Sequence, residues 1–311
     1  MSTNSDLLCL GVDWSRPAEP SLRLANLGST APSYLLPLNG LIGFRITDSS
    51  TRYCAGWFDL TGDEPCHVNC ESWERISSGK QCRRCQFKEG FLSAHQAHRG
   101  AAQLPDNVRT YLTQPHWLYL DIFADGSSKV GTVAESRLAS RLAEQGAVAA
   151  YYVARANDGI RIREAEAAVS TQLRLRQTLS TKRKLEALQS KVDTVGLCDR
   201  LEALVKKVQP FLLSVAESGA IEVPDTPARW RLPSAAVTAF EEAPLIIYPS
   251  QLSSGDHSLY MHGVTGPIGV FAINNEPNPQ LYAGNLANLH GMLLAFGDFH
   301  STVEAAQPSL F

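Results

Sequence analysis

The sequence has few long hydrophobic runs, and no apolar stretch approaches the roughly 18 residues that a membrane-spanning helix needs. Its first residues, MSTNSDLL, are polar and lack the apolar core of an export signal. We therefore expect a cytoplasmic protein, in which thiols stay reduced. Internal repeats and low-complexity tracts are also missing, which excludes a repeat architecture. With 311 residues and 44% hydrophobic content, the chain is long enough for two or three globular domains.

A strong charge of either sign is missing as well, since the formal net charge is −3 at pH 7. The chain as a whole therefore does not attract polyanions, and contact with nucleic acid has to come from a local patch. Residues 171–184 form such a patch without any acidic residue; its basic members are Arg174, Arg176, Lys182, Arg183 and Lys184. The patch fits either a solvated helix face or a phosphate-binding surface.

Cysteine is scarce outside one 20-residue window, which holds four of the seven thiols in the pattern C-x3-C-x11-C-x2-C. A tetrahedral metal ion needs two close pairs of ligands, and the loop between the pairs folds back to bring them together. In a reduced compartment a metal is favoured over two disulfides. We predict a structural zinc held by Cys66, Cys70, Cys82 and Cys85. The other cysteines, Cys9, Cys54 and Cys198, are expected to be ordinary buried side chains.

The first half of the chain is expected to be rich in strands. Residues 33–60 are apolar and aromatic, and Asn39-Gly40 offers a hairpin turn between short strands. Residues 116–123 and 129–133 predict two further strands joined by a turn.

The second half alternates between helical and strand-like patterns. A helix ending at Gly146 is followed by a strand over residues 148–154. Residues 161–205 are mostly helical, with a break expected at Gly196. After Pro224 the pattern becomes strand-like again.

These elements predict an α+β fold in four consecutive segments. A β-rich region with the four-cysteine zinc site comes first, followed by a small α/β domain, a helical connector and a C-terminal β-rich segment. Their predicted boundaries are residues 1–100, 101–180, 181–223 and 224–311.

Residues 116–175 resemble the GIY-YIG nuclease superfamily in their order of strand, turn, strand, helix, strand and helix. The chain is more closely similar to an uncharacterised bacterial and archaeal family of this type, which combines a Q-C-x2-C element with a later K-V-G…E-Q-G-A element. The matching pieces are QCRRC at 81–85, PHWLYL at 115–120, KVG at 129–131 and RLAEQGA at 141–147. The resemblance implies a GIY-YIG-like three-stranded sheet with helices, flanked by the two β-rich regions.

The same resemblance implies a site that cleaves phosphodiesters. Tyr119 matches the tyrosine of the first tripeptide, and Lys129 stands where the second tripeptide has a tyrosine. Arg141 matches the helix arginine, with Arg137 as its competitor, and a guanidinium can clamp a phosphate with two hydrogen bonds. A lysine at position 129 can bind phosphate as a point charge.

An acidic residue and several histidines complete this hypothesis. Glu166 matches the glutamate that holds a divalent metal, with Glu164 as its competitor, and its oxygen ligands suit Mg²⁺ or Mn²⁺. His116 could orient a substrate phosphate or a water. His95 and His98 are either alternative zinc ligands or members of one helix face.

Three functions are consistent with these residues. The first is a GIY-YIG-like, metal-dependent endonuclease that acts on DNA or RNA and carries a structural zinc. The second is a zinc-stapled protein that binds nucleic acid, including tRNA, without cutting it. The third is a fold recruited for small-molecule or acyl chemistry, in which Arg141 binds a carboxylate or a nucleotide phosphate. Taken singly, each residue also has a structural explanation: Tyr119 as a packing residue, and Arg137 and Arg141 as a charged helix face.

Overall fold

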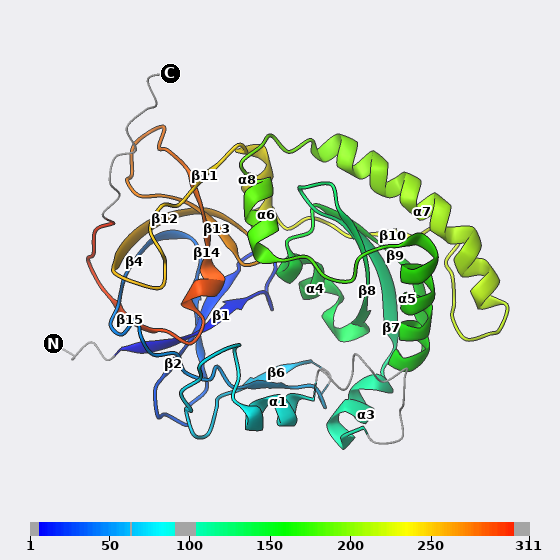
Figure 1. Cartoon of the computed structure of the whole chain (residues 1–311), viewed down its shortest axis with the longest axis horizontal. Helices are drawn as coiled ribbons and strands as arrows, with labels where there is room; N and C mark the ends of the chain where they lie inside the picture. The colour runs from blue at the N-terminus through cyan, green and yellow to red at the C-terminus, as the bar shows by residue number, and fades with distance from the viewer. Residues whose placement is uncertain (1–5, 63, 91–103, 302–311) are drawn as a thin grey trace.

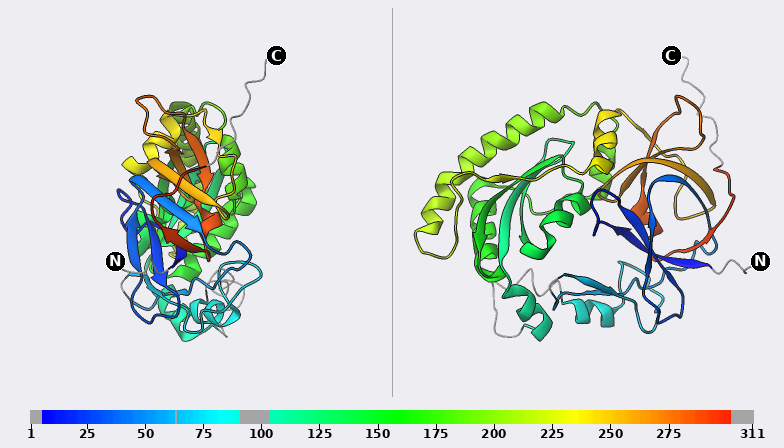
Figure 2. Two further views of the ribbon diagram at one scale, coloured as in Figure 1. Left: turned by 90° about the vertical axis from the view of Figure 1, so that its left-hand side faces the viewer. Right: turned by 180° about the vertical axis from the view of Figure 1, so that it is seen from behind.

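The computed structural model describes residues 6–62, 64–90 and 104–301. Two sheets lie side by side across the molecule, and most of the helices pack around the smaller one (Figures 1 and 2). Seven α-helices occur in these ranges, so the prediction of a mixed α+β fold is confirmed.

The larger sheet combines both ends of the described chain. Its order is β11-β14-β13-β12-β4-β15-β1-β2-β3, so N-terminal and C-terminal strands interleave. The strands are β1 Leu7–Asp13, β2 Ser21–Asn26, β3 Tyr34–Pro37, β4 Gly40–Ile46, β11 Ile246–Ile247, β12 Asp256–Thr265, β13 Ile268–Ala272, β14 Tyr282–Asn285 and β15 Leu293–Phe296. Two regions that the sequence suggested as separate therefore share one sheet, whereas the four predicted boundaries stay a prediction.

The predicted hairpin at Asn39-Gly40 is wrong. β3 pairs with β2 at the sheet edge, whereas β4 lies between β12 and β15. The reason is burial: Ile42, Phe44 and Ile46 alternate along β4 and are at most 7% exposed, because the C-terminal strands enclose them. A local turn signal is overridden by this distant pairing.

The smaller sheet has the order β10-β9-β7-β8. Its strands are β7 His116–Ile122, β8 Ser128–Ala134, β9 Ala149–Ala156 and the two-residue β10 Ala228–Arg229. The three longer strands confirm the predicted three-stranded core. One face of β7 carries Leu118, Leu120 and Ile122, which pack in a core shared with α5 and α7. The other face carries Tyr119, which packs with residues of α4 and of the larger sheet.

The helices begin and end at recognisable signals. Their ranges are α4 Leu138–Gln145, α5 Gly159–Leu173, α6 Thr181–Ala187, α7 Thr194–Ala216 and α8 Ser234–Glu241. Gly146 ends α4 in the left-handed conformation, as predicted. The predicted break at Gly196 is wrong, because Gly196 lies in the first turn of α7, where the Asp193 side chain accepts a hydrogen bond from its N–H. The first break instead follows α5, which ends at Arg174 in the left-handed conformation.

A third region, formed by the cysteine-bearing loops, lies below both sheets in the view of Figure 1. It contains the hairpin of β5 Trp57–Asp59 and β6 Cys66–Val68, followed by α1 Arg83–Glu89 and α3 Asp106–Leu112. A core of four thiols fills its interior, with Trp57 and Ile76 packed against it.

Candidate functional site

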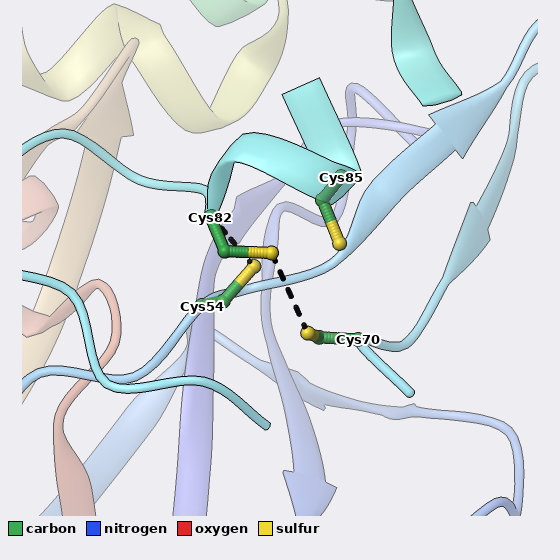
Figure 3. Close-up of side chains that lie close together, drawn as sticks. All are labelled: Cys54, Cys70, Cys82 and Cys85. Atoms are coloured by element: carbon green, nitrogen blue, oxygen red, sulfur yellow. Dashed lines mark hydrogen bonds between the residues drawn. The ribbon is translucent and has the colours of Figure 1, made fainter. Parts of the chain in front are cut away.

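Four cysteine side chains meet in the loop region and point toward one another (Figure 3). They are Cys54, Cys70, Cys82 and Cys85, and all are at most 3% exposed. Their sulfur atoms all lie within 4.8 Å of one another, and the Cys70 and Cys82 Sγ atoms are 3.9 Å apart. Four thiolates on a tetrahedral zinc, with Zn–S bonds of about 2.3 Å, would be separated by about 3.8 Å. We call this group the thiol cluster; its geometry can hold a metal ion.

The structure corrects one of the four predicted ligands. Cys66 is exposed, and its thiol contacts only the His67 carbonyl, 3.9 Å away, among the contacts of the described residues. Its place is taken by Cys54, which the sequence suggested as an ordinary buried side chain. Cys54 lies 28 residues before Cys82, yet the Cys82 N–H donates to Cys54 Sγ at 3.1 Å. Cys66 is the first residue of β6, where its side chain is exposed and outside the group of four buried thiols.

The protonation chemistry of the thiol cluster fits a metal as well. Burial raises the pKa of Cys54 to about 12 and also raises that of Cys85. Burial acts to raise the pKa of Cys70, but the hydrogen bonds from the Ser72 hydroxyl and from the Glu74 and Ser72 backbone together outweigh it, so that this pKa is lowered to about 7. A buried group of four sulfurs without counter-charges favours neutral thiols, and a divalent cation would release their protons. All seven cysteines are free, so the disulfide alternative is not realised.

A cavity of about 560 Å³ is lined by residues of the thiol-cluster loops, strand β1 and helix α4. Its volume is in the range of small-molecule sites. Arg141 and Gln145 of α4 line it, together with Arg137 from the preceding turn. Arg137 is neutralised by Glu144, whose oxygens lie 2.7 and 2.6 Å from its Nη2, whereas Arg141 is 3.7 Å from the same carboxylate. Arg141 is therefore the less neutralised guanidinium on this wall.

Behind α4 lies a second, largely buried group of polar side chains. Gln145 donates to the Tyr119 hydroxyl at 2.6 Å and accepts a hydrogen bond from the Lys129 ammonium. The Lys129 ammonium also lies over the Tyr119 ring, 5.3 Å from its centre. Gly131 faces the same tyrosine, and a Cβ at that position would collide with the hydroxyl. Tyr119 and Lys129 are thus together, but they are only 1% and 7% exposed.

Arg141 extends this group to the cavity, and Glu166 interacts with the charges of the same group. Although burial lowers the pKa of Arg141, the neighbouring Tyr119 and Glu144 raise it above the usual value. Burial raises the pKa of Glu166 on α5, against the opposing charges of Arg163, Lys129 and Arg141. The predicted residues Tyr119, Lys129, Arg141 and Glu166 therefore converge.

Asp121 is a member of this group that sequence reasoning missed. It is 0% exposed, and neither carboxylate oxygen has a hydrogen-bond partner among the described residues. Lys129 lies directly opposite on β8, with its Nζ 3.9 Å from Asp121 Oδ2. The signal was present in the sequence as a charged residue inside the apolar run HWLYLDIF. The burial of Arg163 and Lys184 was also missed, because both lie in helical segments rich in charged residues, and such segments are usually exposed.

We refer to these ionisable residues as the buried charge cluster: Asp121, Lys129, Arg141, Arg163, Glu166 and Lys184. Burial lowers the pKa of Lys184 to about 8, and Lys129 contributes to this lowering. Lys184 donates to the Gln145 carbonyl at 2.6 Å, and its ammonium lies 4.6 Å from the centre of the Phe123 ring. The Arg163 guanidinium donates to the Thr132 hydroxyl at 2.8 Å. In this cluster of described residues, four cations face two carboxylates.

The remaining predicted site residues lie elsewhere. His116 is 0% exposed, and its Nδ1–H donates to the Gln114 carbonyl at 2.8 Å. Burial lowers the pKa of His116 to about 4, so it is a neutral residue of the core. Glu164 is exposed on α5, one position away from the buried face. His95 and His98 lie outside the described residues.

The basic stretch at residues 171–184 does not form one continuous surface. Lys184 turns inward, as described above, and the Arg183 guanidinium is paired with Asp125 at 2.5 Å. Lys182 is exposed and 3.9 Å from Glu186. Arg174 and Arg176 are exposed as well, so the charges of this stretch that remain open to a ligand are fewer than its sequence suggests.

Asp121 should make folding less favourable as the pH rises. Burial raises its pKa from 3.8 to about 6, so its stabilising contribution is complete below about pH 3.8 and is lost as the pH passes through about 6. At 1.36 kcal/mol per unit of pKa, the loss amounts to about 3 kcal/mol. Urea unfolding measures this loss. Between about pH 4 and about pH 7.5, the free energy of unfolding of Asp121→Asn should rise by about 3 kcal/mol relative to that of the wild type.

The pH dependence of the wild type has to be compared with that of Asp121→Asn, because the buried histidines change the stability with pH in the opposite direction. Burial lowers the pKa of His67, His116 and His290, so these groups destabilise the fold as the pH falls. They are common to both proteins and cancel in the difference. A difference that does not change with pH would contradict a desolvated carboxyl at position 121.

Among the residues that the structure describes, no helix has both the length and the apolar character needed to cross a membrane. A family model described as protein of unknown function (DUF2797) matches residues 49–264. The match covers more than half of the chain, which therefore belongs to this family, and it agrees with the predicted resemblance to an uncharacterised family. No curated protein and no solved structure matches the chain.

Proposed function

We propose that this member of the DUF2797 family binds a compact, phosphate-bearing ligand in its central cavity, with Arg141 as the anion-binding group. We further propose that the thiol cluster holds a structural zinc. This is the third function considered above, with a GIY-YIG-like framework recruited for a small ligand. With these four thiolates as its ligands, a tetrahedral zinc would have no coordination position left for a substrate, as is usual for structural zinc.

The observation that carries the proposal is the charge imbalance behind Arg141. Four cations face two carboxylates in the buried charge cluster, and the charges of Asp121 and Glu166 are themselves disfavoured by burial. Excess positive charge in a low-dielectric interior is costly, and a bound anion would relieve it. Arg141 is where this excess reaches the cavity, because its side chain lines the cavity and is 25% exposed. A guanidinium binds phosphate oxygens in a bidentate way, which suits this position.

The proposal is tested by titrating the full chain with inorganic phosphate, pyrophosphate and phosphate monoesters in a calorimeter. We expect Arg141→Met to weaken the binding of the best ligand by about 10- to 100-fold, because one charge-assisted contact contributes about 1.5–3 kcal/mol. Arg161→Met removes an exposed guanidinium from α5 and serves as the matched control. Absence of binding in the wild type, or equal affinities for both variants, would overturn the proposal.

Metal-dependent cleavage of nucleic acid is a second candidate, favoured by the convergence of Tyr119, Lys129, Arg141 and Glu166. In this mechanism Glu166 would hold Mg²⁺ or Mn²⁺, which would stabilise charge on the phosphoryl group. Because Tyr119 and Lys129 are buried, a polymer would have to reach the site from the Arg141 side. The exposed residues Arg174 and Arg176 could contribute salt-sensitive contacts to DNA or RNA, including tRNA.

Glu166→Gln separates cleavage from binding. If the chain cuts DNA, RNA or an activated phosphodiester with Mg²⁺ or Mn²⁺, we expect Glu166→Gln to lower the rate at least about 100-fold with little change in affinity. Glu164→Gln, which changes an exposed carboxylate on the same helix, should cut at the wild-type rate. Failure of the wild type to cut any of these substrates would eliminate this candidate and leave the binding proposal standing.

A further inference from the structure

The lining of the cavity also includes two imidazoles with unpaired nitrogens. His67 and His290 both line the cavity, and the Nδ1 atom of each is buried without a hydrogen-bond partner among the described residues. Burial lowers the pKa of His67 to about 4 and that of His290 to about 3, so both rings are neutral at physiological pH. Neutral rings with unpartnered nitrogens are suited to hydrogen bonds with a ligand rather than to charge pairing.

The hydrogen-bonding role of His67 follows from its contacts. Its Nε2 lies 2.7 Å from the Ala55 carbonyl oxygen, which can only accept, so Nε2 carries the proton. The Nδ1 atom is then a bare acceptor. The Phe58 ring stands edge-on to the imidazole, with centroids 5.2 Å apart, and fixes its orientation. A ligand would have to offer an N–H or O–H donor to Nδ1.

His290 is held in place by the backbone around it. Its carbonyl accepts a hydrogen bond from the Arg52 guanidinium at 2.8 Å, and the following Gly291 N–H donates to the Cys9 carbonyl at 2.7 Å. Gly11, at φ +116°, lies against the imidazole, and a Cβ there would come within 3.0 Å of His290 Cδ2. The ring is therefore positioned before any ligand arrives, which reduces the entropy cost of binding.

Aromatic side chains of β5 also line the cavity. Phe58 of β5 lines the cavity and is 39% exposed although it is a large apolar side chain, and the neighbouring Trp57 lines the cavity as well while it packs against the thiol cluster. Aromatic side chains of this kind stack on nucleobases and contribute about 1–3 kcal/mol per base. The lining of the cavity thus combines the Arg141 guanidinium with an exposed aromatic ring and an unpartnered hydrogen-bond acceptor.

We propose that the ligand of the cavity is a nucleotide, whose phosphate is bound at Arg141 and whose base lies against His67, His290 and the β5 aromatic side chains. An amino or ring N–H group of the base donates to His67 Nδ1. This ligand class rests on the proposed function, because the phosphate end is the Arg141 site. A cavity of about 560 Å³ accommodates one such molecule but not a nucleic-acid duplex.

The test compares ligands that carry one or both ends of a nucleotide. The full chain is titrated calorimetrically with AMP, GMP, CMP and UMP, with ribose 5-phosphate, and with adenosine. We expect at least one nucleotide to bind about 10-fold or more tightly than ribose 5-phosphate and than adenosine. His67→Phe, which keeps a ring but removes the acceptor, should lower that nucleotide's affinity about 10-fold and leave ribose 5-phosphate unchanged.

His290→Gln is a second variant, and His262→Phe, on an exposed position of β12, is the control. His290→Gln should weaken nucleotide binding selectively, and His262→Phe should behave like the wild type. Melting temperatures of all variants identify any that fail to fold. Equal affinity for ribose 5-phosphate and every nucleotide would overturn base recognition while the anion site stands. Nucleotide binding that Arg141→Met does not weaken would overturn the anion site, and no binding at all would overturn both.

Discussion

Replacing Cys54 with serine should release the metal from the protein, whereas replacing Cys66 should not. We expect about one zinc per chain in reduced wild-type protein, because four buried sulfurs lie at distances that suit one tetrahedral ion. In Cys54→Ser the ligand set becomes incomplete, and the zinc content should fall close to zero. Metal binding at a structural site contributes to folding directly, so the loop region should unfold at a much lower temperature. Elemental analysis and thermal unfolding measure the two effects.

Cys66→Ser is the matched control, since Cys66 belongs to the same loop region but is exposed and outside the thiol cluster. It should retain the full zinc content and the wild-type melting temperature. Loss of zinc from Cys66→Ser and its retention in Cys54→Ser would restore the ligand set expected from spacing alone. Absence of metal from all three proteins would contradict a zinc site of either composition.

The thiol cluster and the central cavity share a wall, which links the metal to the proposed ligand. Ala55 and Gly56 directly follow Cys54, and Lys80 and Gln81 directly precede Cys82; all four line the cavity. Hydrogen bonds tie these segments together, since the Ala55 N–H donates to the Lys80 carbonyl at 3.1 Å. A structural metal would therefore fix the position of His67 and the β5 aromatic side chains indirectly, through the backbone that carries them.

Local patterns were sufficient to predict the middle of the fold. The run HWLYLDIF, the Asp125-Gly126 turn and the following KVG segment predicted β7 and β8 nearly to the residue. Gly146 correctly marked the end of α4. These elements form from interactions between residues close in the sequence, so periodicity and turn chemistry carry most of the information.

Features that depend on distant segments could not be predicted in this way. The pairing of β4 with β12 and β15 is decided by the burial of Phe44 between strands from opposite ends of the chain. Cys54 was missed because its spacing of 15 residues to Cys70 resembles no close pair of ligands. The inward turn of Lys184 was likewise hidden, since it depends on the placement of Gln145 after folding.

The pair of Lys129 and Asp121 gives the second large expected effect. Lys129→Met should lower the free energy of unfolding by about 3–5 kcal/mol near neutral pH, because it leaves a buried carboxylate without its cation. The ammonium lies 3.9 Å from Asp121 Oδ2, and both side chains are at most 8% exposed. The loss should be smaller near pH 4, where the Asp121 carboxyl, with a pKa of about 6, is already neutral in the folded protein. Urea unfolding at the two pH values measures this difference.

The double variant Lys129→Met/Asp121→Asn decides whether the effect belongs to the pair. If the cost of Lys129→Met arises from an unpaired carboxylate, the double variant should be more stable near neutral pH than Lys129→Met alone. Its stability should also depend less on pH than that of the single variant, since it has no carboxyl at this position to titrate. If the double variant is instead less stable than the wild type by the sum of the two single-variant costs, Lys129 stabilises the fold through Gln145 and Tyr119 rather than through Asp121. The buried charge cluster would then be held together by the hydrogen bonds of Gln145, which also lines the cavity.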